Sequence, residues 1–343
     1  MKKIFTILSL IGICGVMAQT PHTDPHWIRN DILSDEFDGF KKNIWKEFSG
    51  LEMLGSAFPL SDNIQYGNDN GRDFLRFFAN VENGNIYSGG LVMGPGFNGI
   101  YGLGYGYYEV EARVLQTPNI VSGIYPAFWM QQGNNGIYPY WYEELDIFEV
   151  NNCEVRTNKH HVHYWYYPDE YTPKEVYTDF TKYNVDMSQW HKYAVEWLPE
   201  RVTFYLDNEA FFVIGNEHPK LPWHQNTSLR LGLAIDNPAW CYPYITINRI
   251  LGYYDVNYFR YHQLKYDCKT VVTQISNFNT YDYAVKKSIS LNGTTTIPAN
   301  ANITLRATDY IELQPGFSVD TGRVLYLDIT PCAKVARAVE TQN

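Results

Sequence analysis

The stretch Trp141-Tyr142-Glu143-Glu144-Leu145-Asp146-Ile147-Phe148-Glu149-Val150 places three carboxylates, those of Glu144, Asp146 and Glu149, among apolar and β-favouring residues. A β-strand sends alternate side chains to opposite faces, so Glu144 and Asp146 share one face. The apolar residues between and after them point to the other face. The stretch therefore predicts a strand with an acidic face and a buried face.

Glu149 requires an irregularity in this strand. It lies five positions after Glu144, so in a regular strand it would point to the wrong face. One extra residue near Ile147 and Phe148, accommodated as a β-bulge, returns Glu149 to the acidic face. Three acids on one face repel one another, which is typical of a functional site.

The composition of the chain limits its partners. It has 343 residues, 45% of them hydrophobic and 19% charged, which indicates a globular protein with one large β domain and something smaller. The formal net charge of −10 argues against nucleic acid or an anionic membrane as a partner. Its 29 Tyr and 9 Trp offer flat apolar faces with a polar edge, which suit stacking on sugar rings.

Residues 1–18 are typical of a secretory signal peptide. Lys2 and Lys3 give a basic start, residues 4–16 an apolar run, and Val16-Met17-Ala18 a small-residue cleavage site. The apolar run is too short to span a bilayer. We therefore expect a secreted protein (extracellular, periplasmic or at the cell surface) without membrane insertion, and a monomer.

Four cysteines follow the predicted signal peptide: Cys153, Cys241, Cys268 and Cys332. An even number in an exported chain favours disulfides. A bond between Cys268 and Cys332 would clip together the two ends of the last module, and Cys153 and Cys241 would then pair beside the acidic strand. Four free buried thiols are the alternative.

The chain divides into two regions of different composition. Residues 19–266 hold every Trp and consist of short strand-like runs separated by turns, with no convincing long helix. Examples are Tyr107–Val114, Lys192–Trp197 and Arg201–Leu206, the last followed by a turn at Asp207-Asn208. This pattern predicts an all-β sandwich.

Residues 267–332 predict a small all-β module. Short apolar pairs recur at Ile289-x-Leu291, Ile303-x-Leu305, Ile311-x-Leu313 and Phe317-x-Val319. Pairs at such spacing indicate small stacked β rungs. Residues 333–343 form a tail without a motif.

The acidic strand suits glycoside hydrolysis. That reaction needs two carboxyl groups flanking the scissile bond, about 5–5.5 Å apart in a retaining enzyme. Glu144 and Glu149 would be the pair, one ionised and one protonated, with Asp146 between them to keep their charges different. Two alternatives are a solvated acidic strand and a Ca²⁺ site, although one strand presents ligands in a row and not around an ion.

Five segments carry a resemblance to glycoside hydrolase family 16. Glu144-Leu145-Asp146-Ile147-Phe148-Glu149 resembles the family's Glu-x-Asp-x-x-Glu motif, and the likeness covers most of residues 33–263. The other four segments are Leu33-Ser34-Asp35-Glu36-Phe37-Asp38-Gly39 with Trp45, Tyr105–Arg113, Tyr125-Pro126-Ala127-Phe128-Trp129-Met130, and Trp190–Trp197. In the third of these, Tyr125 replaces the first Trp of the family's motif.

The resemblance implies a jelly-roll β-sandwich of two curved antiparallel sheets that cleaves internal β-linkages of a polysaccharide with retention. By position, Glu144 is the nucleophile, Glu149 the acid/base and Asp146 the helper. Trp129 and Trp141 would be sugar platforms. His163 on the next strand, with Trp165 two positions further, is expected to reach the site.

The resemblance implies no cofactor for catalysis, but some members bind a structural Ca²⁺ on the convex face. Glu36 matches one ligand position. Asn257 stands where the family usually has Asp, and its amide oxygen is a weaker ligand for Ca²⁺.

The substrate expected from the resemblance is a β-1,3- or β-1,3-1,4-glucan. A basic cluster after the acidic strand suggests an alternative, a marine galactan such as agarose, porphyran or carrageenan; it consists of Arg156, Lys159, His160, His161 and His163. A non-catalytic carbohydrate-binding sandwich is the alternative of another class. The small module resembles β modules appended to secreted enzymes of the Bacteroidetes, and we expect it to be a spacer.

Overall fold

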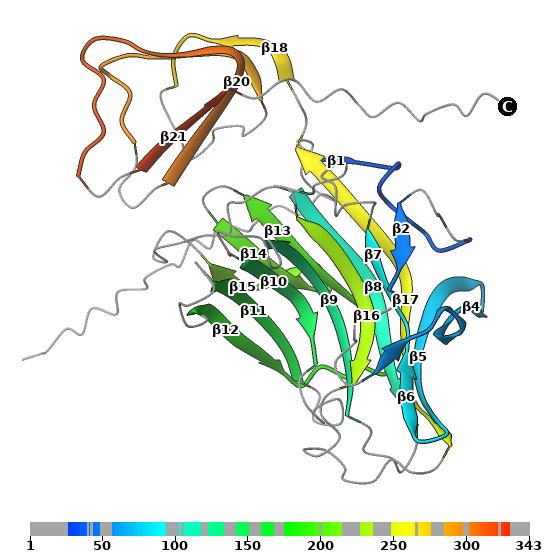
Figure 1. The fold of residues 1–343 in the computed structure, drawn as a ribbon. Helices are drawn as coiled ribbons and strands as arrows, with labels where there is room; N and C mark the ends of the chain where they lie inside the picture. Colours follow the sequence, from blue (N-terminus) through cyan, green and yellow to red (C-terminus); the bar gives the residue numbers. More distant parts are fainter. Residues whose placement is uncertain are drawn as a thin grey trace, which may run out of the picture.

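The computed structural model describes residues 27–39, 41, 44–48, 57–93, 103, 106–117, 123–133, 142–150, 159–167, 175–198, 201–214, 227–235, 248–264, 267–275, 285–297, 302–321 and 324–329. This part of the chain forms twenty-one strands and a single short 3-10 helix, η1 (Ser61–Asn63). The predicted all-β class is therefore confirmed (Figure 1). No helix among the described residues is long and apolar enough to cross a membrane.

A ten-stranded sheet forms one layer of the sandwich. Its strands are β1 (Trp27–Arg29), β3 (Phe58–Pro59), β4 (Ile64–Asp69), β5 (Arg72–Glu82), β6 (Asn85–Ser88), β8 (Gly106–Gln116), β13 (His191–Leu198), β14 (Arg201–Leu206), β15 (Glu209–Ile214) and β17 (Arg249–Leu264). Their order is β15-β14-β13-β8-β17-β5-β6-β3, with β1 paired to β17 and β4 to β5. Every pair is antiparallel except β3 with β6.

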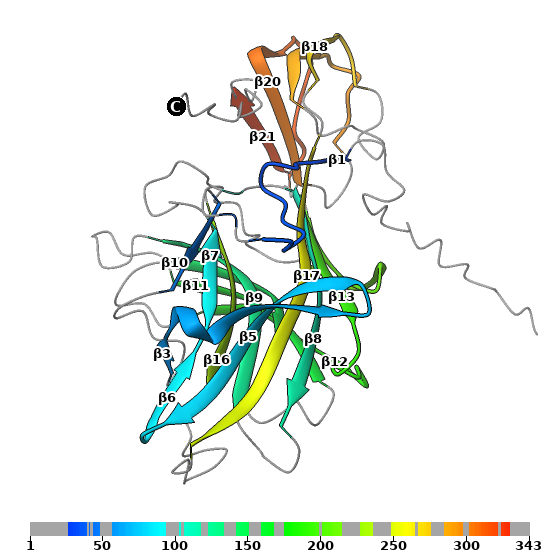
Figure 2. The same ribbon diagram turned by 90° about the vertical axis from the view of Figure 1, so that its right-hand side faces the viewer.

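A seven-stranded antiparallel sheet forms the other layer. Its strands are β2 (Trp45–Glu47), β7 (Gly90–Met93), β9 (Ile124–Gly133), β10 (Tyr142–Glu149), β11 (Lys159–Tyr167), β12 (Glu175–Tyr183) and β16 (Ser228–Ile235), in the order β12-β11-β10-β9-β16-β7-β2. Figure 2 shows the two curved sheets lying against each other. The acidic strand β10 thus lies inside its sheet, between β9 and β11.

Tight turns join three of the antiparallel strand pairs. Asn70 and Gly71 connect β4 to β5, and Asn83 and Gly84 connect β5 to β6, all four with positive φ between 51° and 87°. Asn and Gly tolerate this conformation, and two such residues make a hairpin turn that matches the twist of the strands. The turn predicted at Asp207-Asn208 is the third, with φ of 52° and 70°.

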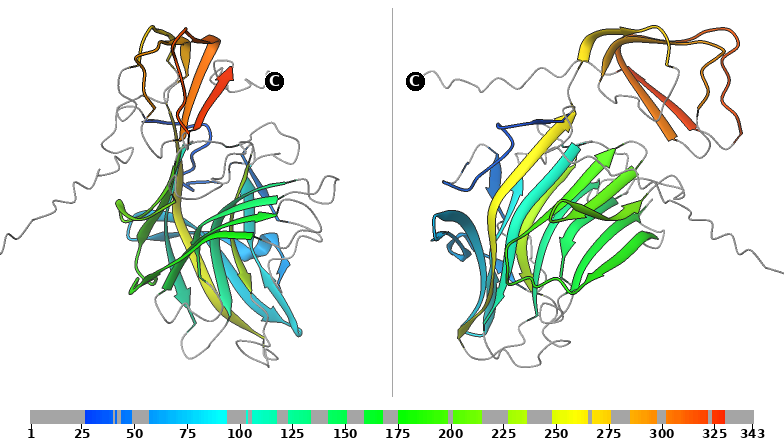
Figure 3. Two further views of the ribbon diagram at one scale, coloured as in Figure 1. Left: turned by 90° about the vertical axis from the view of Figure 1, so that its left-hand side faces the viewer. Right: turned by 180° about the vertical axis from the view of Figure 1, so that it is seen from behind.

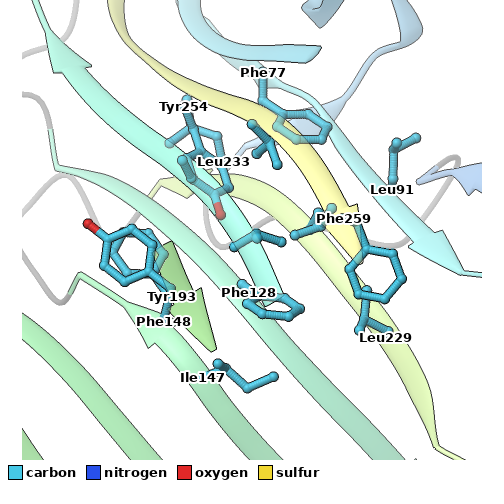
Figure 4. Close-up of a cluster of buried hydrophobic side chains, with 14 of the residues drawn as sticks. Phe77, Leu91, Phe128, Ile147, Phe148, Tyr193, Leu229, Leu233, Tyr254 and Phe259 are labelled. Carbon is cyan, nitrogen blue, oxygen red and sulfur yellow. The ribbon is translucent and has the colours of Figure 1, made fainter. Parts of the chain in front are cut away.

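The apolar core lies between the two sheets and is rich in aromatic rings (Figure 4). Phe148 of β10 packs on Tyr193 of β13, with ring centroids 4.2 Å apart. Phe128 of β9 meets Phe259 of β17 edge-on at 6.2 Å. All four rings are fully buried, and each such pair adds about 0.5–1.5 kcal/mol to the energy of area burial. The buried face of β10 is therefore tied to the opposite sheet.

A four-stranded sheet follows β17 in the chain. It consists of β18 (Asp267–Val272), β19 (Lys286–Leu291), β20 (Asn302–Leu313) and β21 (Val324–Ile329), paired in this order and all parallel. Figure 3 shows it beyond the end of β17. It has its own apolar cluster, which includes Ile289, Leu291 and Leu305.

The prediction of separate rungs in this module was wrong in two places. The pairs 303–305 and 311–313 lie in one strand, β20, because its two ends pair with different neighbours: residues 302–307 with β21, and residues 307–313 with β19. The pair 317–319 follows a turn and lies outside any strand. Apolar spacing alone does not distinguish two short strands from the two halves of a long one.

Cys268, in β18, is disulfide-bonded. Cys153, Cys241 and Cys332 lie outside the described residues. The pairing of Cys268 with Cys332, and that of the other two, stays a prediction.

Candidate active site

The acidic strand β10 lies between β9 and β11 in an antiparallel register. Asp146 is opposite Trp129 on β9 and His163 on β11. Glu144 is opposite Gln131 on β9 and Trp165 on β11. Residues directly opposite in a ladder share a face, so the register brings three strands together on the acidic face.

The predicted β-bulge is present. The pairing of β10 with both neighbours shifts after Asp146: on β9 the next pair is Phe148 with Phe128, and on β11 it is Glu149 with His161. Ile147 is thus the extra residue. Ile147 and Phe148 are both buried in the core, so two consecutive side chains point inward and Glu149 returns to the face of Asp146.

Two side chains of neighbouring strands approach the Glu149 carboxylate. The hydroxyl of Tyr125 on β9 donates a hydrogen bond to Oε1 of Glu149. Nε2 of His163 on β11 lies 3.9 Å from Oε2. Glu149 is 7% exposed and His163 4%, so both groups act at short range with little water between them. His163 thus lies beside Glu149, and its predicted contact with sugar stays a prediction.

Sequence reasoning did not place Tyr125 in the site. The signal was present, because Tyr125 and Trp129 are four residues apart on β9 and therefore share a face of that strand. What the sequence did not give is the register between β9 and β10, which puts residue 125 within reach of residue 149. The replacement of the family's Trp by Tyr at this position supplies a hydroxyl beside the acid.

Arg230 is a second residue that the sequence did not single out. It lies on β16 opposite Trp129, and the carbon of its guanidinium group is 4.7 Å from the centroid of the Trp129 ring. This distance is that of a cation–π contact. Arg230, Trp129, Asp146 and His163 therefore form one row across four neighbouring strands.

The remaining predicted sugar-binding residues are described only in part. Trp141 lies outside the described residues, and Trp165 is placed by its backbone pairing with Glu144. Trp129 is partly exposed, as a platform requires. Their predicted contacts with sugar stay predictions.

The basic residues expected to form a cluster after the acidic strand do not all lie on one face of β11. His160 is fully buried in the core, and this burial lowers the pKa of His160 to about 3, so its ring is neutral. His161 and His163 lie on the other face of β11, with their rings stacked 5.9 Å apart, and Nδ1 of His161 is 2.9 Å from the Thr181 hydroxyl. Arg156 lies outside the described residues.

The side chains at the predicted calcium position do not fit the ion. The carboxylate of Glu36 accepts hydrogen bonds from Arg260, at 2.8 and 3.0 Å, and from Arg29 at 2.5 Å. Burial alone would raise the pKa of Glu36, but these guanidinium groups lower it. The Nδ2 atom of Asn257 donates to the carbonyl of Asp73 at 2.5 Å. Two cations already neutralise the carboxylate that Ca²⁺ would need.

No group of three or more His, Cys, Asp or Glu side chains that could hold a metal occurs in the described ranges. The structural Ca²⁺ stays a prediction that this donor set does not favour.

The fold and the site together define a jelly-roll β-sandwich with a bulged, three-acid strand in the interior of one sheet. Residues 72–237 match the sequence profile of the family described as "Glycosyl hydrolases family 16". This part of the chain is similar in sequence to that family.

Three proteins illustrate what the chain is similar to. An endo-1,3-1,4-beta-glycanase, EglC, of Rhizobium meliloti is 27% identical over 135 residues, which are 39% of this chain and 26% of that protein. The chain thus spans about a quarter of this relative. The structure of a Bacteroides ovatus mixed-linkage glucan family 16 enzyme with a bound product matches with a TM-score of 0.55 at 18% identity, over 67% of this chain and 99% of that one. The kappa-carrageenase of Pseudoalteromonas carrageenovora matches with a TM-score of 0.53 at 19% identity, over 71% and 98%. At such identities the two structures show the shared fold.

Proposed function

We propose that the protein is a retaining endo-glycosidase that cleaves internal linkages of a β-1,3- or β-1,3-1,4-glucan. The observation that carries this proposal is the bulge of β10, which brings Glu149 to the same strand face as Glu144 and Asp146. The match of residues 72–237 to family 16 and the resemblance to an endo-1,3-1,4-beta-glycanase support the activity and the substrate class.

The reaction has two steps. In the first, the Glu144 carboxylate attacks the anomeric carbon while Glu149 gives its proton to the glycosidic oxygen, so one C–O bond forms and the glycosidic C–O bond breaks. In the second, Glu149 takes a proton from a water molecule, whose oxygen attacks the same carbon and releases Glu144. Two inversions at one carbon retain the configuration.

Asp146 lies between the two glutamates along β10 and is almost completely buried, 3% exposed. A negative charge there disfavours the simultaneous ionisation of both neighbours, which keeps a proton on one of them. Its position supports the role of a residue that maintains the different protonation of the two catalytic acids. His163 and Trp129 lie directly opposite Asp146 on the two neighbouring strands.

The direct test is to incubate the purified protein with laminarin, lichenan, agarose, porphyran and carrageenan and to measure the reducing ends that are released. Release of reducing ends and short oligosaccharides from laminarin or lichenan would support the proposal. So would ¹H NMR spectra in which the β-anomer of the product forms first. Glu144→Gln and Glu149→Gln should each lower kcat by more than about 10³-fold. A Glu144→Gln protein that still cleaves at the wild-type rate would overturn the assignment.

A galactan is the second candidate substrate, and Arg230 is the observation that favours it. Its guanidinium group lies beside Trp129, in the row of residues that contains Asp146. A guanidinium group recognises sulfate or carboxylate with directed hydrogen bonds. The resemblance to a kappa-carrageenase fits this candidate. If the protein cleaves only sulfated galactan, the glucan proposal is wrong and a galactan is the substrate.

If the protein binds one of the five polysaccharides but hydrolyses none of them, the alternative of a non-catalytic carbohydrate-binding sandwich is favoured. We further propose that residues 1–18 direct export and that the small parallel sheet of residues 267–329 is a spacer. Amino-terminal sequencing of the protein from its producing cell tests the first proposal. The second predicts that removal of residues 267–343 leaves kcat on soluble polysaccharide unchanged.

A further inference from the structure

We infer that His160 is a positioning residue for catalysis, because its buried ring holds the bulge of β10 from the core side and so fixes the direction of Glu149. The catalytic part of this inference rests on the proposed function. The structural part, the hydrogen bond from the ring to the bulge, does not.

The hydrogen bond joins His160 to the extra residue of the bulge. Nε2 of His160 lies 3.0 Å from the carbonyl oxygen of Ile147. Ile147 is the residue that neither β9 nor β11 pairs in its ladder. A bulge leaves such a residue outside the regular pattern of backbone hydrogen bonds. A carbonyl group turned toward an apolar core needs a donor, and a buried carbonyl without one costs about 1–3 kcal/mol.

The ring of His160 has little freedom to turn away from this carbonyl. Its centroid lies 5.0 Å from that of Tyr193, 5.4 Å from Phe148 and 5.4 Å from Phe211. These rings come from β13, β10 and β15, so both sheets contribute to the cage. The His160 side chain is completely buried inside it.

The surroundings also determine which nitrogen carries the proton. Burial lowers the pKa of His160 to about 3, so the ring is neutral in the range where glycosidases work. Because the Ile147 carbonyl is an acceptor, Nε2 is the nitrogen that bears the hydrogen. Nδ1 has no hydrogen-bond partner among the described residues. The side chain therefore acts as a single donor aimed at one backbone oxygen.

The two residues between Asp146 and Glu149 are thus fixed in different ways. The carbonyl of Ile147 is held by His160, and the ring of Phe148 is clamped against Tyr193 at 4.2 Å. If the carbonyl of Ile147 loses its donor, the bulge can relax toward other backbone conformations. Glu149 then moves as well, because it directly follows the two bulge residues Ile147 and Phe148. A misplacement on the order of 1 Å in a catalytic group costs about 10²-fold in rate.

The experiment compares two substitutions in the full chain on the polysaccharide that the wild-type protein cleaves. His160→Phe keeps an aromatic ring but removes the donor, and His160→Gln supplies an amide N–H at a similar reach. We expect His160→Phe to lower kcat by about 10- to 100-fold with KM within about twofold, and His160→Gln to regain about tenfold of that loss. Val202→Ala, in the core at β14 and away from the bulge, is the matched control for lost stability, and its kcat should not change.

Three outcomes would overturn the inference: an unchanged kcat in a folded His160→Phe protein, an equal loss in Val202→Ala, or no recovery with His160→Gln. A readout that needs no activity keeps the test independent of the proposed function. The ¹⁵N shifts of the wild-type His160 ring should show the neutral form with hydrogen on Nε2 from pH 5 to 8. The Phe148 and Glu149 amides should exchange faster in His160→Phe. A wild-type protein that cleaves no glycan would refute the function and leave this second test intact.

Discussion

The hydroxyl of Tyr125 donates a hydrogen bond to Oε1 of Glu149, although the two residues are 24 positions apart in the chain. Tyr125 lies on β9, which pairs with β10, and the bulge of β10 turns Glu149 toward Tyr125. The acid/base of the proposed reaction is thus oriented by a side chain that replaces the Trp expected from the family's motif.

Tyr125→Phe should therefore reduce activity without unfolding the protein. A hydrogen bond between uncharged groups contributes about 0.5–1.5 kcal/mol, which corresponds to about 2- to 10-fold in kcat if it acts mainly on the reacting state. Steady-state kinetics on the substrate of the wild-type protein, with thermal unfolding as control, would measure this. Equal kcat for both proteins would show that the hydroxyl does not orient Glu149.

The neutral, buried His160 makes stability depend on pH. Its pKa is about 3 in the folded protein and about 6.5 in the unfolded chain, so between these values the unfolded chain binds more protons. The free energy of unfolding should then fall as pH falls from 6.5 toward 3.

Urea unfolding at pH 7, 6, 5 and 4 would measure this dependence in the wild-type protein and in His160→Gln. The variant lacks the titrating ring, so its curve should be flatter over the same range. Parallel curves would contradict the lowered pKa of His160. Other acids titrate equally in both proteins and cancel in the comparison.

Gly106 has a packing reason to be glycine. A Cβ atom at this position would lie 2.4 Å from a ring carbon of Tyr261 and 2.9 Å from the His262 carbonyl oxygen. Gly106→Ala should lower the free energy of unfolding by about 1–3 kcal/mol, the usual cost of overpacking. Gly39→Ala is the matched control, because a Cβ there meets nothing within 4 Å. Equal unfolding midpoints for the two variants would contradict the steric argument.

The guanidinium groups around Glu36 predict that the protein does not depend on calcium for stability. Arg260 and Arg29 already satisfy the carboxylate, so an added Ca²⁺ would have to displace them. We expect the Tm in excess EDTA and in millimolar CaCl₂ to agree within about 1 °C, as for a protein with no ion bound to the folded state. A rise of several degrees with calcium would restore the predicted ion site.

The local features of the acidic strand could be predicted because they depend on side-chain alternation alone. The spacing of Glu144, Asp146 and Glu149 predicted both the strand and the bulge, and the alternation at 107–114 and 192–197 predicted β8 and β13. The turn at Asp207-Asn208 followed from the tolerance of these residues for positive φ.

Contacts between distant segments could not be predicted in this way. Arg230 meets Trp129 because β16 pairs with β9 across about a hundred residues, and the register of that pair has no local signature. His160 was assigned to a basic surface because its neighbours are basic. Because His160 is two residues before Val162, side-chain alternation could have placed both on the core side of β11. The hydrogen bond from His160 to the carbonyl of Ile147 could not be predicted in this way.

Because of the bulge, Glu144 and Glu149 share a strand face although they are an odd number of positions apart. With Ile147 present, an odd separation between Glu144 and Glu149 behaves as an even one, at the cost of one displaced carbonyl that His160 must serve. With Ile147 deleted, the separation becomes even by count, and the strand needs neither the bulge nor the donor. The deletion of Ile147 and the replacement of His160 by an apolar residue should therefore compensate each other in part. The inserted residue and the histidine one strand away are expected to be gained or lost together.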